Sequence, residues 1–332
     1  MPADGPLVIA HRGASGYRPE HSRAAYELAI AMGCGAVEPD VVPTQDGVLV
    51  VRHENEISGT TDVADRPEFA DRRTTKAFLG VRQTGWFTED FTWDELSTLR
   101  VRERLPKLRS GSAAHDGAEP MLRLSDVLAV SADAERPVGV VVEIKHDAYF
   151  RSIGFDLAQL VDDELSASGW SVGGALPAPL TIESFEPGVL DRLRSRGRAA
   201  DYVFLLEASG APPDLIAERG AEAPSYAEIA TPAGLDRWAA GYDGISVAKS
   251  MLLGPEASGE AGRALVGAAH ERGLGVYTWT CRPENAFLAP RFRGPGGKAA
   301  FGDYAGEWGV IRETGVDGVF ADHTDLALDA FR

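Results

Sequence analysis

The sequence predicts an α/β protein, a (β/α)8 TIM barrel with an insertion after the second strand. Eight short β-rich runs recur along its 332 residues, and stretches with helical periodicity separate them. Such repeats are typical of a parallel sheet covered by helices, and eight of them favour closure into a barrel. An open doubly wound sheet is the alternative, which we disfavour because no Gly-x-Gly-x-x-Gly turn opens a first helix.

The predicted strands share a high content of β-branched and other apolar residues. They span residues 7–10, 36–42, 138–144, 180–182, 202–206, 244–247, 275–280 and 318–321. The predicted helices between them span residues 22–32, 124–132, 150–168, 187–196, 213–219, 260–272 and 304–314. We therefore expect residues 1–332 to form a single barrel domain.

Residues 55–120 interrupt this alternation. The segment contains clusters of Gly, Asp, Arg and Pro and no convincing βα unit. It is too long for an ordinary loop, so we expect an insertion subdomain that covers the site at the strand ends. Packing within the insertion explains its aromatic residues Trp86, Phe87, Phe91 and Trp93, whereas an exposed apolar rim would favour a phospholipid substrate.

Composition narrows the range of partners. The formal net charge of -17 repels nucleic acid and anionic lipid surfaces, so a small polar substrate is expected. Cys34 and Cys281 are too few for a disulfide framework. No segment has the length of a membrane span, and no signal peptide pattern opens the chain. We expect no stable membrane insertion and a cytoplasmic protein as the chain stands, or a periplasmic or secreted one if a signal peptide was removed; the oligomeric state stays open.

Two carboxylates lie within the second predicted strand. Glu38 and Asp40 are one residue apart, so the two-residue period of a strand points both to one face. A buried pair of like charges needs a cation or a shared proton. Asp46-Gly47 then predicts a tight turn, and a returning strand over residues 48–51 would bring His53 beside Glu38. The hairpin therefore indicates a metal or proton-handling site.

Charged residues also follow the first and third strands. His11-Arg12-Gly13 comes directly after the first, and Glu143-x-Lys145 closes the third. Arg12 suits bidentate capture of a phosphate, and Gly13 would let the backbone approach it closely. A structural histidine or a simple salt bridge would explain each group in isolation. Their convergence at the carboxyl ends of three strands favours a metal-phosphate site.

Together these motifs resemble the glycerophosphodiester phosphodiesterase family. The resemblance spans nearly the whole chain and rests on His11-Arg12-Gly13, Pro19-Glu20, Glu38-x-Asp40, Asp46-Gly47, Val50-Val51, His53, Glu143-x-Lys145, Asp317-Gly318 and Asp322. Residues 57–65, with the long insertion after them, are similar to the branch that has bacterial periplasmic members. The resemblance implies a (β/α)8 barrel, one divalent cation, and hydrolysis of glycerophosphodiesters to glycerol 3-phosphate and an alcohol.

The resemblance also implies roles for single residues. It assigns the metal to Glu38, Asp40 and Glu143, proton transfer to His11 and His53, and the phosphate to Arg12 and Lys145. An all-oxygen ligand set favours Ca²⁺ or Mg²⁺ over zinc. Trp279, at the end of the seventh strand, either contacts the glycerol moiety or packs the barrel mouth.

Several residues depart from the family pattern or lie outside its main motifs. His21-Ser22 stands where the family often has Asn-Thr, and Glu54 where many members have Asp, which bears on substrate preference more than on activity. We expect Asp322 to anchor nearby loops. Solvated loop charges best explain Glu207 and Lys249, and a surface or loop position is expected for His115, His146, His270 and His323.

Two other functions stay open beside hydrolysis. The first is phospholipase D or sphingomyelinase D-like phospholipid cleavage, which gives a cyclic phosphate on a similar fold. The second is a non-catalytic phosphate-binding barrel. We disfavour that one because both histidines and all three carboxylates are present.

Overall fold

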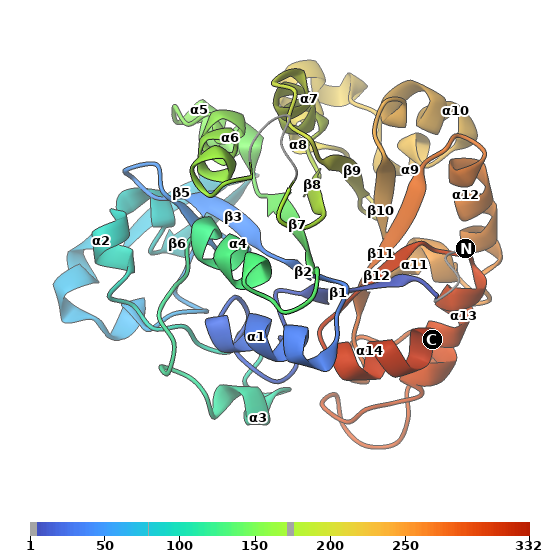
Figure 1. Cartoon of the computed structure of the whole chain (residues 1–332), viewed down its shortest axis with the longest axis horizontal. Helices are drawn as coiled ribbons and strands as arrows, with labels where there is room; N and C mark the ends of the chain where they lie inside the picture. Colours follow the sequence, from blue (N-terminus) through green and yellow to red (C-terminus); the bar gives the residue numbers. More distant parts are fainter. Residues whose placement is uncertain (1–4, 79, 171–175) are drawn as a thin grey trace.

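Eight parallel strand positions form a closed barrel in the computed structural model, which describes residues 5–78, 80–170 and 176–332 (Figure 1). The strands are β1 (Leu7–His11), β2 (Ala36–Glu38) with its continuation β3 (Asp40–Pro43), β7 (Gly139–Ile144), β8 (Leu180–Ser184), β9 (Asp201–Leu206), β10 (Gly244–Ala248), β11 (Gly275–Cys281) and β12 (Gly318–Ala321). Strand β1 pairs in parallel with both β2 and β12, which closes the ring. The predicted (β/α)8 barrel is confirmed.

Alternation along the strands decides which side chains enter the barrel. Ile9, Ala36, Val141 and Phe320 form a small buried cluster of their own, separate from the larger core between strands and helices. Because residues two apart on a strand share a face, His11 points to the same side as Ile9, and Glu143 to the same side as Val141. The alternation thus directs polar side chains at the strand ends into the barrel mouth.

The hairpin after the second strand forms as predicted. Strand β4 (Leu49–Val51) runs antiparallel to β3, with Val41 opposite Val51 and Pro43 opposite Leu49. Gly47 has a φ of 80°, which suits glycine in a tight turn. The chain therefore returns to the strand ends immediately before His53.

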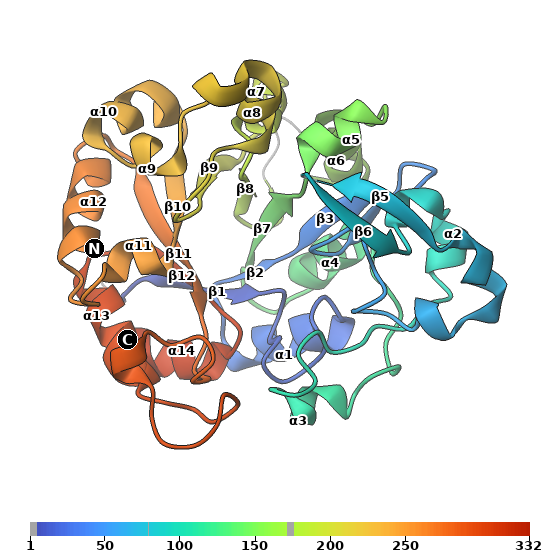
Figure 2. The same cartoon turned by 180° about the vertical axis from the view of Figure 1, so that it is seen from behind.

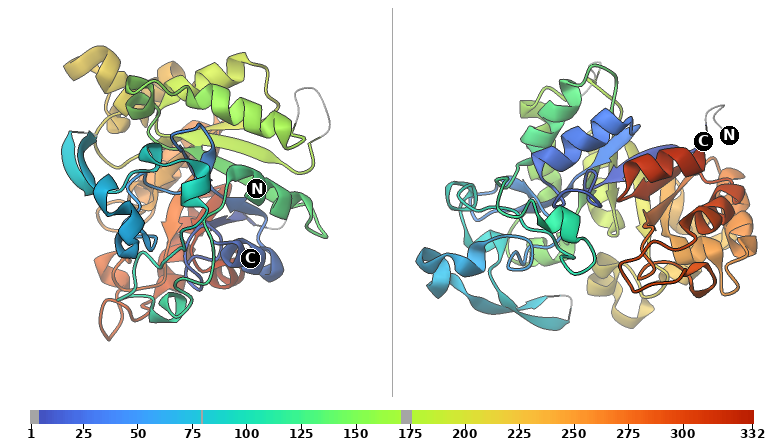
Figure 3. Two further views of the ribbon diagram at one scale, coloured as in Figure 1. Left: turned by 90° about the vertical axis from the view of Figure 1, so that its left-hand side faces the viewer. Right: turned by 90° about the horizontal axis from the view of Figure 1, so that it is seen from below.

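Helices surround the barrel in the order that the sequence predicts (Figures 1 and 3). They include α1 (Arg23–Met32), α4 (Leu124–Ala132), α5 (Asp147–Ser152), α6 (Leu157–Ala167), α7 (Pro187–Ser195), α8 (Pro213–Arg219), α11 (Lys249–Leu253), α12 (Glu260–His270), α13 (Tyr304–Glu313) and α14 (Thr324–Phe331). The prediction of one helix over residues 150–168 is wrong, because the chain breaks between α5 and α6. Gly154 lies in this break with a φ of 99°, a conformation that ends a helix.

The insertion lies mainly to one side of the barrel (Figures 1 and 2). It contains an antiparallel pair, β5 (Thr74–Phe78) and β6 (Val81–Gly85), and the short helices α2 (Trp93–Leu96) and α3 (Ser110–Ala113); residue 79 is outside the described residues. Trp86, Phe87 and Phe91 are buried and Trp93 is half-buried. The insertion's aromatics therefore pack its interior.

Two arginines of the insertion reach the carboxyl ends of the strands, where Arg109 pairs with Glu284 and Asp322 at 2.7 and 2.6 Å. Arg104 pairs with Glu20 at 2.5 Å. That the insertion covers the site stays a prediction. Across the described part of the chain, we find no helix with the length and apolar character needed to cross a lipid bilayer.

Candidate active site

A cavity of about 340 Å³ opens at the carboxyl ends of the strands. It is lined by His11, Arg12, Glu38, His53, Arg104, Glu143, Lys145, Glu183, Phe185, Leu205, Glu207, Trp279, Thr280, Arg282 and Phe320. Seven of the eight predicted site residues are in this lining, and Asp40 is buried next to it. A larger surface groove of about 860 Å³ beside α7 and α8 contains none of them, so size alone does not locate the site.

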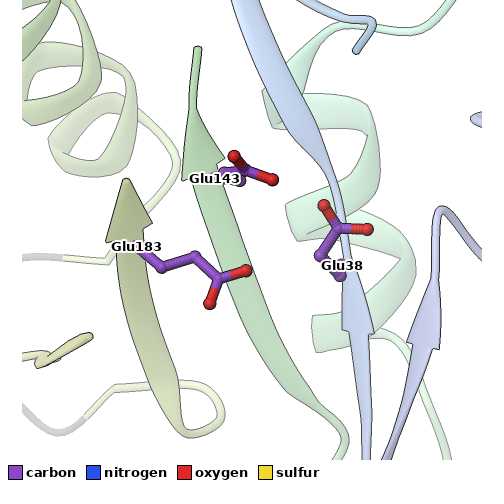
Figure 4. A group of neighbouring side chains, drawn as sticks. All are labelled: Glu38, Glu143 and Glu183. Carbon is purple, nitrogen blue, oxygen red and sulfur yellow. The ribbon is translucent and has the colours of Figure 1, made fainter. Parts of the chain in front are cut away.

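Three glutamates converge in this cavity (Figure 4). Glu38, Glu143 and Glu183 each offer a carboxylate oxygen, and these oxygens lie within 4.8 Å of one another. Glu143 and Glu183 are register neighbours on β7 and β8. The sequence analysis did not single out Glu183, although it follows directly on the predicted strand at 180–182 and shares with Glu38 and Glu143 a place at a strand end.

Asp40 lies beside this group but is engaged differently. Its Oδ2 accepts a hydrogen bond from His21 Nε2 at 2.9 Å and is 3.1 Å from Arg12 Nε. Its Oδ1 is 3.3 Å from Lys145 Nζ. His21 thus contacts a predicted metal ligand without lining the cavity. Ser22, the next residue, caps helix α1 by accepting from the Ala25 amide. The role of Asp40 as a metal ligand stays a prediction.

The acidic residues fit a divalent cation. Glu38 Oε1 and Asp40 Oδ1 are buried, and neither has a hydrogen-bond partner among the described residues. Burial, followed by the charge of Asp40, raises the pKa of Glu38 well above its usual range. Burial also raises the pKa of Glu143 to about 8, with Asp40 adding to the shift and Lys145 opposing it. Asp40 Oδ1 has an ion pair with Lys145, whereas Glu38 Oε1 has no partner, and a hard cation would satisfy such a buried oxygen.

Arg12 is held in place through its backbone as well as its side chain. Its amide donates to Glu38 Oε2 at 2.8 Å, and its Nη1 to Glu20 Oε2 at 3.0 Å. Arg12 and His21 both have a φ of 60°, which is uncommon for residues with a side chain. Gly13, expected beside the phosphate, is absent from the cavity lining; its φ of 81° and close approach to helix α1 explain the glycine.

His11 is oriented by a buried carboxylate. Its Nδ1 donates to Asp322 Oδ1 at 2.6 Å, and Asp322 Oδ2 accepts from Arg109 and Arg282, both at 2.6 Å. Burial, assisted by the charge of Arg12, lowers the pKa of His11 to about 4. A neutral ring whose Nδ1 carries the proton leaves Nε2 as a lone-pair acceptor. Asp322, which we expected to anchor nearby loops, thus also orients His11.

His53 has a similar carboxylate partner. Its Nδ1 donates to Glu54 Oε1 at 2.5 Å, and Glu54 Oε2 is 2.6 Å from Arg104. Burial, followed by the charges of Arg12 and Lys145, lowers the pKa of His53 to about 3. The two histidines therefore enter the cavity with the same ring nitrogen bound to a carboxylate, which sequence reasoning alone could not predict.

Aromatic side chains form the remaining wall. The rings of Trp279 and Phe185 meet edge to face with centroids 5.5 Å apart, and Trp279 Nε1 is 3.4 Å from the Ser246 carbonyl oxygen. Lys145 Nζ lies 5.3 Å from the centroid of Phe185. Trp279 thus both lines the cavity and packs its mouth, so the two interpretations of this residue are compatible.

The remaining charged residues and histidines differ in whether they reach the cavity. Glu207 is exposed yet lines the cavity, whereas Lys249 pairs with Glu307 at 2.5 Å outside it. His323 lies in the loop between β12 and α14, which is one of the two expected positions, and its ring is buried against Tyr17 and Phe301. His270 is at the surface, where it contacts Asp317 at 2.8 Å.

Comparison with known proteins agrees with this geometry. The family model for the glycerophosphoryl diester phosphodiesterase family matches residues 11–326. A glycerophosphodiester phosphodiesterase of Arabidopsis thaliana is 31% identical over 330 residues, which cover 96% of this chain and 84% of that protein.

Solved structures support the fold. A phosphodiesterase of Oleispira antarctica, crystallised with the product sn-glycerol-3-phosphate, has a TM-score of 0.62 at 18% identity and covers 98% of this chain and 96% of its own. A glycerophosphodiester phosphodiesterase of Agrobacterium tumefaciens has a TM-score of 0.57 at 18% identity, covering 98% and 99%. With the family model matched over nearly its whole length, the chain belongs to the glycerophosphoryl diester phosphodiesterase family and is an enzyme of that class.

Proposed function

We propose that the enzyme hydrolyses small glycerophosphodiesters to glycerol 3-phosphate and an alcohol, with a divalent cation and two histidines. The observation that carries the proposal is one cavity that collects His11 and His53 with the acidic cluster, Arg12 and Lys145. The product found in the Oleispira antarctica enzyme supports the substrate class.

The cation would be held by Glu38, Asp40 and Glu143. When bound, it neutralises charge on the phosphate and favours attack at phosphorus. The unpartnered oxygen of Glu38 supports this assignment, and so do burial and mutual repulsion, which raise the pKa of Glu38 and Glu143. Ca²⁺ and Mg²⁺ both accept such oxygen ligands.

Arg12 and Lys145 would bind the non-bridging oxygens of the phosphate. Both side chains line the cavity, and both are already held by carboxylates, Arg12 by Glu20 at 3.0 Å and Lys145 by Glu143 at 2.5 Å. Fixed cations of this kind stabilise the charge that develops on the phosphoryl oxygens without reorganising during the reaction. Trp279 would then contact the glycerol moiety.

The histidines would move the protons. One neutral histidine takes a proton from the attacking water at Nε2, a P–O bond forms, and the bond to the alcohol breaks as the other histidine protonates the leaving oxygen. Each transfer contributes about 10²–10⁴-fold in rate. We assign the acid to His53 and the base to His11. The low pKa values, about 4 for His11 and about 3 for His53, leave both rings neutral at pH 7, so they do not separate the two roles. As the acid, His53 must first take up a proton at Nε2.

Phospholipid cleavage to a cyclic phosphate is the second candidate. The burial of Trp86, Phe87 and Phe91 argues against an apolar rim on the insertion, although Trp93 is half-buried. The same active-site residues could still direct an internal hydroxyl at phosphorus, so the product must be identified. We further propose that residues 1–332 form one domain with residues 55–120 as its insertion.

The test measures release of glycerol 3-phosphate from a panel of glycerophosphodiesters, with and without chelator, and identifies the product by phosphorus NMR. We expect hydrolysis that is lost in chelator and restored by Ca²⁺ or Mg²⁺. His270→Ala is the control for His11→Ala and His53→Ala, because His270 is at the surface and outside the cavity. Activity that persists in chelator would refute the metal assignment, and a cyclic product would favour the second candidate.

A further inference from the structure

Glu183 is a buried carboxylate that the proposed mechanism does not use. Its side chain is 2% exposed, and it makes no hydrogen bond or ion pair with any described residue. Its neighbour Glu143 differs, because Lys145 compensates that charge at 2.5 Å. A buried carboxylate without a donor is costly, so the position of Glu183 demands a cation or a proton.

The direction of Glu183 argues for a cation. Its carboxylate points into the space that it shares with Glu38 and Glu143, as Figure 4 shows, and oxygens of all three lie within 4.8 Å of one another. Glu38, which is 1% exposed, aims an unpartnered Oε1 into the same cluster. Glu183 and the unpartnered oxygen of Glu38 thus face one space, while the other oxygen of Glu38 accepts from the Arg12 amide. A shared proton would satisfy only one pair of oxygens.

We propose that Glu183 is a further protein ligand of the bound cation and that the resulting four-carboxylate site selects Ca²⁺ over Mg²⁺. The inference rests on the proposed function, in which Glu38, Asp40 and Glu143 already hold the cation. Ca²⁺ takes six to eight oxygen ligands in a flexible arrangement. Mg²⁺ needs near-ideal octahedral geometry and retains several waters, so it gains little from a fourth carboxylate.

The experiment titrates Ca²⁺ and Mg²⁺ into the metal-free protein by calorimetry. We expect Glu183→Gln to weaken Ca²⁺ binding by about tenfold or more and Mg²⁺ binding far less, so that the preference for Ca²⁺ falls. Glu207→Gln is the matched control, because Glu207 lines the same cavity but is exposed. Its Ca²⁺ affinity is expected to stay within about twofold of the unmodified enzyme, since an exposed charge is screened.

A second variant separates ligation from charge. Glu183→Asp keeps the charge and withdraws the oxygens by one methylene. If Glu183 is a ligand, this variant should bind Ca²⁺ more weakly; if its role is purely electrostatic, the Ca²⁺ affinity should not change. Melting in chelator checks that each variant folds. Should Glu183→Gln and Glu183→Asp both bind Ca²⁺ like the unmodified enzyme while Glu38→Gln does not, the inference alone is wrong. If Glu38→Gln also binds normally, the proposed metal site itself fails.

Discussion

Asp322→Asn tests how the enzyme prepares His11. The carboxylate divides its oxygens, since Oδ1 accepts from His11 Nδ1 while Oδ2 accepts from Arg109 and Arg282. An asparagine keeps only one acceptor oxygen, and the two guanidinium groups would hold it. The amide NH2 would then face His11 and force Nδ1 to accept, which moves the ring proton to Nε2.

The magnitude follows from these contacts. A base with its proton on Nε2 cannot accept another there, so loss of this function should cost about 10²–10⁴-fold in kcat/KM. Arg109 and Arg282 would exchange a charged acceptor for a neutral one. Charged hydrogen bonds contribute about 1.5–3 kcal/mol each and neutral ones about half as much. Because both donors stay charged, we expect the free energy of unfolding to fall by at most about 3 kcal/mol.

The assay compares a glycerophosphodiester that has an alkoxide leaving group with an activated nitrophenyl ester. Loss of the base slows both substrates, because each needs the nucleophile. Asp317→Asn is the control, since Asp317 pairs with the exposed His270. If folded Asp322→Asn retains the activity of the unmodified enzyme on both esters, then Asp322 does not set the tautomer of His11. Slowing of the alkoxide substrate alone would instead make His11 the acid.

Three further outcomes are expected. Glu38→Gln should remove metal-dependent activity and the rise in melting temperature with added Ca²⁺, which melting curves with and without chelator measure. In chelator, the free energy of unfolding should fall between pH 7 and 8, by at most about 1.4 kcal/mol per pH unit for one group. Glu143 contributes because its folded pKa of about 8 lies above the ordinary 4.5, so its stabilising proton is lost as pH rises. Glu186 has the same raised pKa of about 8, so Glu143→Gln should reduce the slope of the free energy of unfolding against pH, measured by urea denaturation, without removing it. His53→Ala should slow the alkoxide substrate more than the nitrophenyl ester, and equal slowing would contradict its role as the acid.

The barrel was predictable because its strands are buried on both faces. Parallel strands of this kind appear as continuous apolar runs, as in the Val-rich segment of β7, whose residues are all buried. The helix break at Gly154 was missed because the apolar pattern continues across it and a single glycine is tolerated in many helices.

Local motifs predicted most of the site's residues but few of the contacts among them. Glu38, Glu143, His11 and Arg12 each stand at a strand end, so their position followed once the barrel was predicted. Contacts between distant segments did not follow. The bond from His11 to Asp322 joins residues 311 positions apart, and Glu183 becomes a neighbour of Glu143 only through the register of β7 and β8. One sequence without an alignment contains no signal for such pairings.

Charge balance connects the metal, the substrate and pH. Glu38, Asp40, Glu143 and Glu183 together outnumber the nearby cations Arg12 and Lys145, and a phosphodiester adds another negative charge. In the metal-free enzyme, burial and mutual repulsion raise the pKa of the three glutamates. Their carboxylates are therefore partly protonated when no cation is bound. Cation binding must release those protons, and metal affinity should therefore increase with pH. A rate profile measured at low Ca²⁺ consequently combines metal binding with histidine titration, whereas the profile at saturating Ca²⁺ reports the histidines alone.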